Sequence, residues 1–293
     1  MKKILKKLYD LLPAKKAIFS FIKLFWTPPH SVYKHLYFKG TFKVQVPGAN
    51  GFRLMHYSGE IENDIFGQGL TAGWEKRSMK LWIELCKEAD VIMDIGANTG
   101  IYALTAKSLR PGAKVFAFEP LKRVMQKLRT NNDLNGFNIS CINKALSNNT
   151  GTAIIYEQDT ELINAATLNA ETGMAARLEK KTEIETTTLD DFLEEWKIEN
   201  IDLVKIDVET HEPQVIEGYL KNLSIHKPSF LIEILTDEVG EKLHKYFTPL
   251  GYLYFNINDT SDTIRKTNKL TQSDYFNYLV CSEKTAQKLG LIN

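Results

Sequence analysis

The chain has 293 residues, of which 43% are hydrophobic and 25% are charged, and its net charge is +1 at pH 7. These values exclude a disordered chain, and the length allows one large α/β domain with a modest extension. The three cysteines (Cys86, Cys141 and Cys281) are too widely spaced for a disulfide framework or a zinc pattern, which favours a reduced, cytoplasmic setting.

Charge is unevenly distributed along the chain. Residues 1–30 contain seven lysines and one aspartate, a net charge of +6, so the remainder carries −5. The body therefore offers no basic stripe, and we expect no nucleic-acid partner. The interrupted apolar pattern of residues 1–16 argues against a signal peptide, and the apolar stretch 17–26 is too short to span a bilayer. For residues 1–26 two alternatives remain: peripheral contact with an anionic membrane, or packing on the domain or a second copy.

The sequence predicts three parts. A basic amphipathic helical segment occupies residues 1–30 and ends at a Thr-Pro-Pro break. An extension at residues 31–88 contains a predicted hairpin, a glycine-bearing loop and a helix. The main domain is predicted to occupy residues 89–293. Within the extension, the hairpin strands are expected at 41–46 and 51–57, the loop at 66–69 and the helix at 74–87.

Alternating strands and helices follow in the main domain. Strands are predicted at 91–95, 114–118, 138–143, 151–157, 182–187, 202–206 and 229–234. Helices are predicted at 99–109, 121–134, 189–196, 212–221 and 237–248, and a terminal antiparallel hairpin near 252–257 and 276–282. The polar segment 158–180 has no predicted fold and is expected to be a loop over the site. This order favours an α/β fold with a doubly wound, mostly parallel sheet, whose ligand lies outside the carboxyl ends of the strands.

The first chemical motif joins a glycine turn to a distant acid. An apolar run ends in Asp94 and the turn Gly96-x-Asn98-x-Gly100, and a second apolar run ends in Glu119, which is 23 positions after Gly96. A turn with few side chains lets a nucleoside lie against the backbone, and an acid at this spacing accepts hydrogen bonds from ribose hydroxyls. The unit is therefore predicted to hold an adenosine-bearing cofactor, with a ligand-free βα turn as the alternative.

The identity of that cofactor follows from charge. Asp94 would repel a pyrophosphate, and the third glycine of a dinucleotide turn is missing, whereas an acid suits the cationic sulfonium and amino group of S-adenosylmethionine. No Gly-Lys-Ser/Thr follows the turn, which excludes a P-loop.

A second cluster of ionisable residues follows the strand at 202–206. Alternation along the strand puts Lys205, Asp207 and Glu209 on one side, and a buried Lys205 needs one of the two acids as a partner. His211 and Glu212 come next. The alternative reading is an ion pair or a helix cap. The strand at 229–234 delivers Glu233 to the same edge, which suggests a charged substrate pocket.

Together these motifs resemble the FkbM family of S-adenosylmethionine-dependent methyltransferases. Six stretches match in the family's order: 91–102 (VIMDIGANTGIY), 116–120 (FAFEP), 143–147 (NKALS), 187–192 (TTLDDF), 201–218 (IDLVKIDVETHEPQVIEG) and 228–233 (PSFLIE). The resemblance implies a class I methyltransferase (Rossmann-like) fold. It also implies O-methylation of a hydroxyl on a sugar, glycan or secondary metabolite.

By position, the resemblance assigns cofactor roles to several residues. The methionine end of the cofactor would be lined by Asp94, Gly96, Asn98 and Gly100; Glu119 would hold the ribose; and a turn at Ala145 and Leu146 would border the adenine. Asp207 falls where related O-methyltransferases keep an acid beside the reacting methyl. Thr210 is a departure, because the family usually has glycine there, and a positive φ would cost threonine about 1 kcal/mol or more.

Two questions of mechanism stay open in the sequence. The general base can be Asp207, Glu209 or His211, with Lys205 as the charged partner of the acids. A Mg²⁺ ion between Asp207 and Glu233 is an alternative that the sequence favours less. The competing functions are hydride transfer, methylation of a nucleic-acid base, methyl transfer to a non-hydroxyl acceptor, and a non-catalytic nucleoside-binding or membrane-docking module. The turn chemistry and the absence of an Asn/Asp-Pro-Pro-Tyr/Phe motif after residue 206 argue against the first two.

Overall fold

The computed structural model describes residues 14–26, 37–157, 166–169, 178 and 180–293. Its centre is an eight-stranded sheet with the strand order β13-β12-β14-β11-β10-β3-β4-β5. In this sheet β11, β10, β3, β4 and β5 run parallel to one another. β14 pairs antiparallel with both β11 and β12, and β13 pairs antiparallel with β12. The doubly wound, mostly parallel α/β sheet and its antiparallel C-terminal part are therefore confirmed. The strands are β3 (Val91–Ile95), β4 (Lys114–Phe118), β5 (Ser140–Ile142), β10 (Leu203–Ile206), β11 (Ser229–Glu233), β12 (Leu253–Asn258), β13 (Thr263–Thr267) and β14 (Asn277–Cys281).

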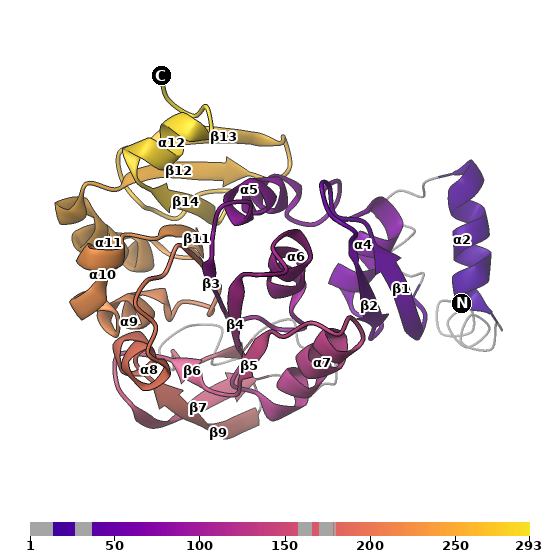
Figure 1. Ribbon diagram of the computed structural model, residues 1–293, viewed down its shortest axis with the longest axis horizontal. Coiled ribbons are helices and arrows are strands. Elements are labelled where there is room, and N and C mark those ends of the chain that lie inside the picture. The colour runs from indigo at the N-terminus through magenta and orange to yellow at the C-terminus, as the bar shows by residue number, and fades with distance from the viewer. Residues whose placement is uncertain (1–13, 27–36, 158–165, 170–177, 179) are drawn as a thin grey trace.

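Helices cover both faces of this sheet, with α5, α6 and α7 on one side and α8 to α11 on the other (Figure 1). Alternation along β3 explains the two cores: Ile92 packs in the cluster of α5 and α6, whereas Met93 and Ile95 pack in that of α8 and α9. The helices are α5 (Lys76–Cys86), α6 (Ile101–Leu109), α7 (Lys122–Asp133), α8 (Leu189–Trp196), α9 (Glu212–Glu217), α10 (Leu220–His226), α11 (Asp237–Phe247) with the 3-10 turn η2 (Thr248–Leu250), and α12 (Glu283–Lys288).

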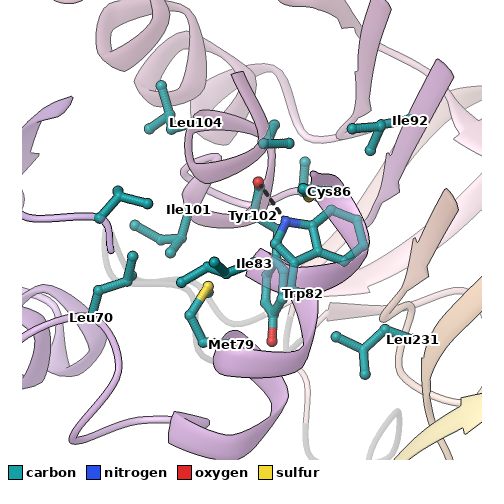
Figure 2. Close-up of a cluster of buried hydrophobic side chains, with 14 of the residues drawn as sticks. Leu70, Met79, Trp82, Ile83, Cys86, Ile92, Ile101, Tyr102, Leu104 and Leu231 are labelled. Carbon is teal, nitrogen blue, oxygen red and sulfur yellow. Dashed lines mark hydrogen bonds between the residues drawn. The ribbon is translucent and has the colours of Figure 1, made fainter. Parts of the chain in front are cut away.

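The extension before the sheet contains the predicted hairpin, formed by β1 (Gly40–Val44) and β2 (Phe52–His56). An unpredicted helix, α4 (Glu60–Gln68), takes up most of the segment expected as a glycine loop and ends at Gly69, whose φ is 96°. The extension shares a core with the main domain. Figure 2 shows Trp82 of α5 among buried side chains of α6 and the sheet, with its indole nitrogen donating to the Tyr102 carbonyl at 3.0 Å.

A separate four-stranded sheet with the order β6-β9-β7-β8 lies beside the main one. It contains β6 (Ala145–Leu146), β7 (Gly151–Glu157), β8 (Ala166–Thr167) and β9 (Lys180–Thr187). The prediction of a turn at Ala145 and Leu146 is therefore wrong, because these two residues form a short strand parallel to β9. Most of the expected loop at 158–180 lies outside the described residues.

One further prediction of local structure was wrong, and one strand was not predicted. The helix expected at 212–221 is two helices that break at Gly218, where a Cβ would lie 2.1 Å from the Ser147 carbonyl oxygen. The backbone at the break therefore requires glycine, because a Cβ at this position would clash with the Ser147 carbonyl group. The terminal strands β12 and β14 pair as predicted, but the polar edge strand β13 between them in sequence was not predicted. Its mostly exposed Thr-Ile-Arg-Lys-Thr sequence carries little hydrophobic signal.

The basic segment is described only from residue 14. Helix α2 (Lys15–Phe25) lies at the edge of the molecule beside β1 and α4 (Figure 1). Predictions for residues 1–13 and 27–36 fall outside the described residues. Within the described part of the chain, no helix has the length and apolarity needed to cross a membrane.

Candidate active site

A cavity of about 260 Å³ opens at the carboxyl ends of β3, β4, β10 and β11. Parallel strands of a doubly wound sheet bring their carboxyl ends to one edge, which is why motifs far apart in sequence meet here. The structure places all of the predicted site residues on the cavity wall except Gly100: Asp94, Gly96, Asn98, Glu119, Ala145, Leu146, Lys205, Asp207, Glu209, His211 and Glu233.

The glycine turn after β3 is wedged between its neighbours. Gly96 has a φ of 81° and donates its amide to the Phe118 carbonyl of β4 at 3.1 Å. On the other side, a Cβ at Gly96 would lie 1.9 Å from the Asp207 carbonyl oxygen. Glycine is therefore required both by the backbone conformation and by close approach. Gly100, with φ 92°, begins α6 and packs toward Leu128 instead of the cavity.

Glu119 ends β4 and is held by backbone amides. Its Oε1 accepts from the Leu121 amide at 2.9 Å and its Oε2 from the Asn98 amide at 3.2 Å, which ties the acid to the glycine turn. Burial raises the pKa of Glu119 to about 7, although these two hydrogen bonds act to lower it. Each carboxylate oxygen accepts more than one hydrogen bond, so Glu119 keeps accepting capacity for a ligand.

Asn143 holds the chain that follows Glu119, a role that sequence reasoning missed. Its side-chain amide donates to the carbonyls of Glu119 and Pro120, both at 2.8 Å. The only sequence signal was its place in the family-like stretch 143–147.

Asp94 is the penultimate residue of β3 and lies on the face of the sheet that α6 covers. The side chain is 2% exposed, and its Oδ2 accepts from the Ala103 amide of α6 at 2.9 Å. Burial raises the pKa of Asp94 to about 7, although the Lys205 ammonium opposes the shift. Asp94 therefore fixes the start of α6 and also presents a carboxyl group to the cavity wall.

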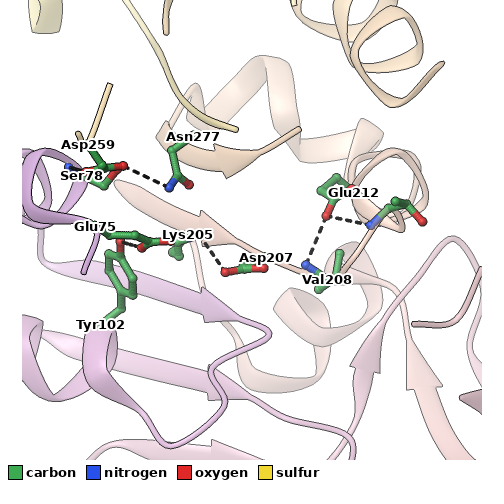
Figure 3. Close-up of polar contacts among 10 residues, drawn as sticks. Glu75, Ser78, Tyr102, Lys205, Asp207, Val208, Glu212, Asp259 and Asn277 are labelled. Carbon is green, nitrogen blue, oxygen red and sulfur yellow. Dashed lines mark hydrogen bonds and ion pairs between the residues drawn. The ribbon is translucent and has the colours of Figure 1, made fainter. Parts of the chain in front are cut away.

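Lys205 is the buried cation of the site, with 1% of its side chain exposed. Its Nζ lies 3.3 Å from Asp207 Oδ2 and 5.2 Å from the centroid of the Tyr102 ring (Figure 3). Burial alone would lower the pKa of Lys205, but the nearby carboxylates of Asp207, Glu75 and Glu233 outweigh burial and raise it. The predicted pairing of Lys205 with an acid is confirmed.

Glu75 also belongs to the site, although no motif pointed to it. It precedes α5 with a φ of 45°, accepts a hydrogen bond from the Tyr102 hydroxyl, and lines the cavity (Figure 3). Burial raises its pKa. The N-terminus of α5 is capped by Asp259, which is distant in sequence. Its Oδ1 accepts hydrogen bonds from the amides of Arg77 and Ser78, both at 2.8 Å.

Carboxyl groups outnumber cations in the half of the cavity formed by β10 and β11. Burial, and then the charge of Asp207, raise the pKa of Glu209 to about 8 and that of Glu233 to about 10. Such shifts mean that a further negative charge is disfavoured here and a positive one is favoured. Across the described residues, no three His, Cys, Asp or Glu side chains are grouped to hold a metal ion. The Lys205 ammonium is the cation beside the predicted Mg²⁺ ligand Asp207.

The loop after β10 is strained. Glu209 and Thr210 have positive φ values of 54° and 79° in succession. Glu212 braces this loop, because its Oε1 accepts from the amides of Val208 at 3.2 Å and Thr210 at 3.3 Å (Figure 3). Glu212 therefore has a structural role in this loop and does not line the cavity, and α9 itself has no side-chain cap hydrogen bond.

We expect Thr210→Gly to raise the free energy of unfolding by about 1 kcal/mol, because it relieves the positive-φ strain of a β-branched residue and removes a buried hydroxyl without a partner. Urea denaturation would measure the change. Thr186→Gly is the matched control: its hydroxyl is also buried and unpartnered, but it lies in β9, so glycine there lowers stability. A loss of stability in both variants would show that Thr210 is not strained.

His211 is a neutral, tethered side chain. Its Nε2 lies 3.0 Å from Ser147 Oγ, and burial lowers the pKa of the imidazole to about 4. Its Nδ1 is buried without a hydrogen-bond partner. His211 lines the cavity, but an imidazole with so low a pKa is a weak proton acceptor.

Comparison with known proteins gives a consistent set of matches. A family model described as the methyltransferase FkbM domain matches residues 94–254. The hexuronic acid methyltransferase AglP of Haloferax volcanii is 30% identical over 144 residues, which cover 49% of this chain and 56% of that protein. The 2-O-methyltransferase NoeI of Sinorhizobium fredii is 30% identical over 183 residues, which cover 57% of this chain and 71% of that protein.

Among solved structures, an FkbM methyltransferase from Methylobacillus flagellatus matches with a TM-score of 0.42 and 17% identity, covering 66% of this chain and 43% of that one. The match to AglP spans little more than half of that relative's length.

Proposed function

This chain belongs to the FkbM methyltransferase family, and on that premise we propose that it is an S-adenosylmethionine-dependent O-methyltransferase acting on a hydroxyl of a sugar, glycan or secondary metabolite. The observation that carries the proposal is the convergence of Gly96, Glu119 and Asp207 on one cavity. The names of the two relatives, which specify a hexuronic acid and a 2-O position, support an acceptor of the sugar class.

The cavity fits the proposed cofactor in shape and in charge. The glycine turn leaves backbone exposed for the nucleoside, Glu119 would accept from the ribose hydroxyls, and Ala145 and Leu146 would border the adenine. The surplus of carboxyl groups suits a compound with a sulfonium and an ammonium group. When bound, the cofactor supplies an electrophilic methyl carbon.

The residues around Asp207 perform the remaining chemistry. The acceptor hydroxyl would be positioned in the β10–β11 half of the cavity, where the Asp207 carboxylate would accept its proton. Lys205 holds Asp207 in place through the contact at 3.3 Å. Trp74 and Tyr102, whose ring centroids are 5.9 Å apart, line the same cavity and would shield the reacting atoms from water.

Asp207 is the best-placed of the three candidate bases. The raised pKa of Glu209, about 8, keeps much of that group protonated at neutral pH, and a protonated acid cannot accept the proton. The lowered pKa of His211 and its bond to Ser147 make the imidazole a weak base. Asp207 has a cation beside it and lies at the end of the central strand β10.

Cofactor binding tests the proposal directly. We expect Glu119→Gln to weaken the affinity for S-adenosylhomocysteine about 10- to 100-fold, because a charge-assisted acceptor is lost and the new amide meets the backbone donors of Asn98 and Leu121. Isothermal titration calorimetry measures the dissociation constant.

The matched control is Glu183→Gln, on the exposed side of β9, which leaves the affinity unchanged. If the wild-type protein binds neither S-adenosylmethionine nor its demethylated product, the proposed function is wrong.

We also expect the site to prefer neutral acceptors to acidic ones. For two glycosides that differ only in a hydroxymethyl or a carboxylate at C6, kcat/KM should be at least about tenfold lower for the carboxylate, because Glu75, Glu209 and Glu233 disfavour another negative charge. Initial rates of methyl transfer with each glycoside give the two values of kcat/KM and their ratio. A preference for the hexuronic acid would contradict the electrostatic argument.

A further inference from the structure

Helix α2 packs Phe19 and Ile22 against the body of the protein and leaves its other large apolar residues exposed to solvent. Lys16, Phe19 and Lys23 recur at helical spacing on the side that contacts the body: Phe19 is buried, and the Lys16 ammonium donates to the Thr41 carbonyl at 2.6 Å. Lys23 donates to the Phe66 carbonyl of α4. A surface helix ordinarily buries most of its apolar residues against the core, whereas α2 buries Phe19 and leaves larger numbers of apolar side chains exposed.

The opposite side of α2 is an exposed apolar face, formed by Ile18, Phe21 and Phe25 at the same spacing, with Leu24 and Trp26 next to it. Phe21 is 63% exposed and Phe25 is 78% exposed. These five residues are half of the ten large hydrophobic side chains that are exposed in the described chain, although α2 is only 11 residues long. A concentration of this kind marks an interaction surface.

Charge indicates what covers this face. Residues 14–26 contain three lysines and no acid, and residues 1–13 add four more lysines against one aspartate. Lys16 and Lys23 donate to backbone carbonyl groups, and the Lys15 ammonium lies 5.5 Å from the centroid of the Tyr37 ring. Aromatic and aliphatic side chains in a segment with a net positive charge are typical of a helix that lies in the interface of an anionic bilayer.

We propose that α2 docks the protein on an anionic lipid surface, with Phe21, Leu24, Phe25 and Trp26 inserted among the lipid headgroups and acyl chains. The lysines hold the helix to the body and draw the assembly to negative headgroups. The same eleven-residue helix is too short to span the bilayer, so the attachment is peripheral and reversible.

Vesicle flotation with the full chain tests the proposal without any methyl transfer. The protein should float with vesicles of phosphatidylcholine and phosphatidylglycerol, and much less with phosphatidylcholine alone. Phe21→Ser with Phe25→Ser should lower partitioning at least about tenfold, since each phenylalanine loses its transfer to an apolar environment. Added salt should weaken binding of the wild-type protein. The matched control is Ile225→Ser on α10, which removes an equally exposed apolar residue (72%) without affecting flotation.

Two results would overturn the proposal. One is equal or absent flotation with the two kinds of vesicle. The other is a dimer of the wild-type protein, seen by sedimentation without lipid, that the double variant dissociates, because a second copy would then cover the face. Circular dichroism of each variant confirms that it is folded, which is expected since the substituted side chains lie mostly in solvent.

Discussion

Asp207→Asn should lower kcat by about 10²- to 10⁴-fold and leave the affinity for S-adenosylhomocysteine within a few-fold of wild type, because general-base assistance contributes on that order while the amide keeps the shape of the side chain. The substitution retains an oxygen near Lys205 but removes the proton acceptor. Steady-state kinetics on any methylated acceptor, combined with calorimetry, separates the two effects.

The comparison with the other candidate bases makes the Asp207 experiment decisive. Glu209→Gln and His211→Ala should each reduce kcat much less than Asp207→Asn, since Glu209 is held largely protonated and His211 is a weak base. The matched control is Asp274→Asn, which should leave kcat unchanged because Asp274 is exposed and lies between β13 and β14. A larger loss in either Glu209→Gln or His211→Ala would move the role of general base to that residue.

Lys205→Met should lower the free energy of unfolding by about 3–5 kcal/mol, the usual cost of removing one partner from a buried ion pair. Methionine fills a similar volume, so the loss comes from charge: Asp207, Glu75 and Glu233 then lie close together without their common cation. Urea denaturation measures the change, with Lys266→Met on the exposed side of β13 as the control.

The pH dependence identifies the cause of that destabilisation. As the pH falls through the raised pKa values of Glu75 and Glu233 (about 10 for Glu233), these groups are protonated, so their attraction to Lys205 in the wild type and their repulsion in the variant disappear. The difference in stability between the two proteins should therefore shrink toward acidic pH. A difference that stays constant with pH would mean that packing of the lysine stem, and not its charge, accounts for the loss.

Much of the central sheet could be predicted because its strands are short, continuous apolar runs between turn signals. β3 and β4 have the predicted bounds, since a strand buried on both faces needs apolar residues at nearly every position. The strand β13 was missed for the opposite reason, because an edge strand with exposed polar residues is stabilised by backbone pairing to β12 alone. Helix α4 was missed because Gly67 lies within its last turn.

The residues of the site likewise differ in whether the sequence could predict them. Asp94, Glu119, Asp207 and Glu233 could be placed together from sequence, because each lies at or next to the carboxyl end of a parallel strand and all such ends share one edge. Glu75 could not, since it reaches the cavity through α5, which packs on the sheet by tertiary contacts with α6 and with Asp259. The roles assigned to these residues remain predictions that the variants above are designed to test.

The position of β14 has a consequence for synthesis on the ribosome. This strand lies between β11 and β12 in the sheet, although it is made after both. The ribbon of β12 and β13 consequently has no neighbour to join until residues 277–281 have emerged, and Asp259, at the tip of that ribbon, cannot reach the start of α5 any earlier. The contact of Asp259 with the start of α5, next to the cavity residue Glu75, must therefore form after β14 has emerged.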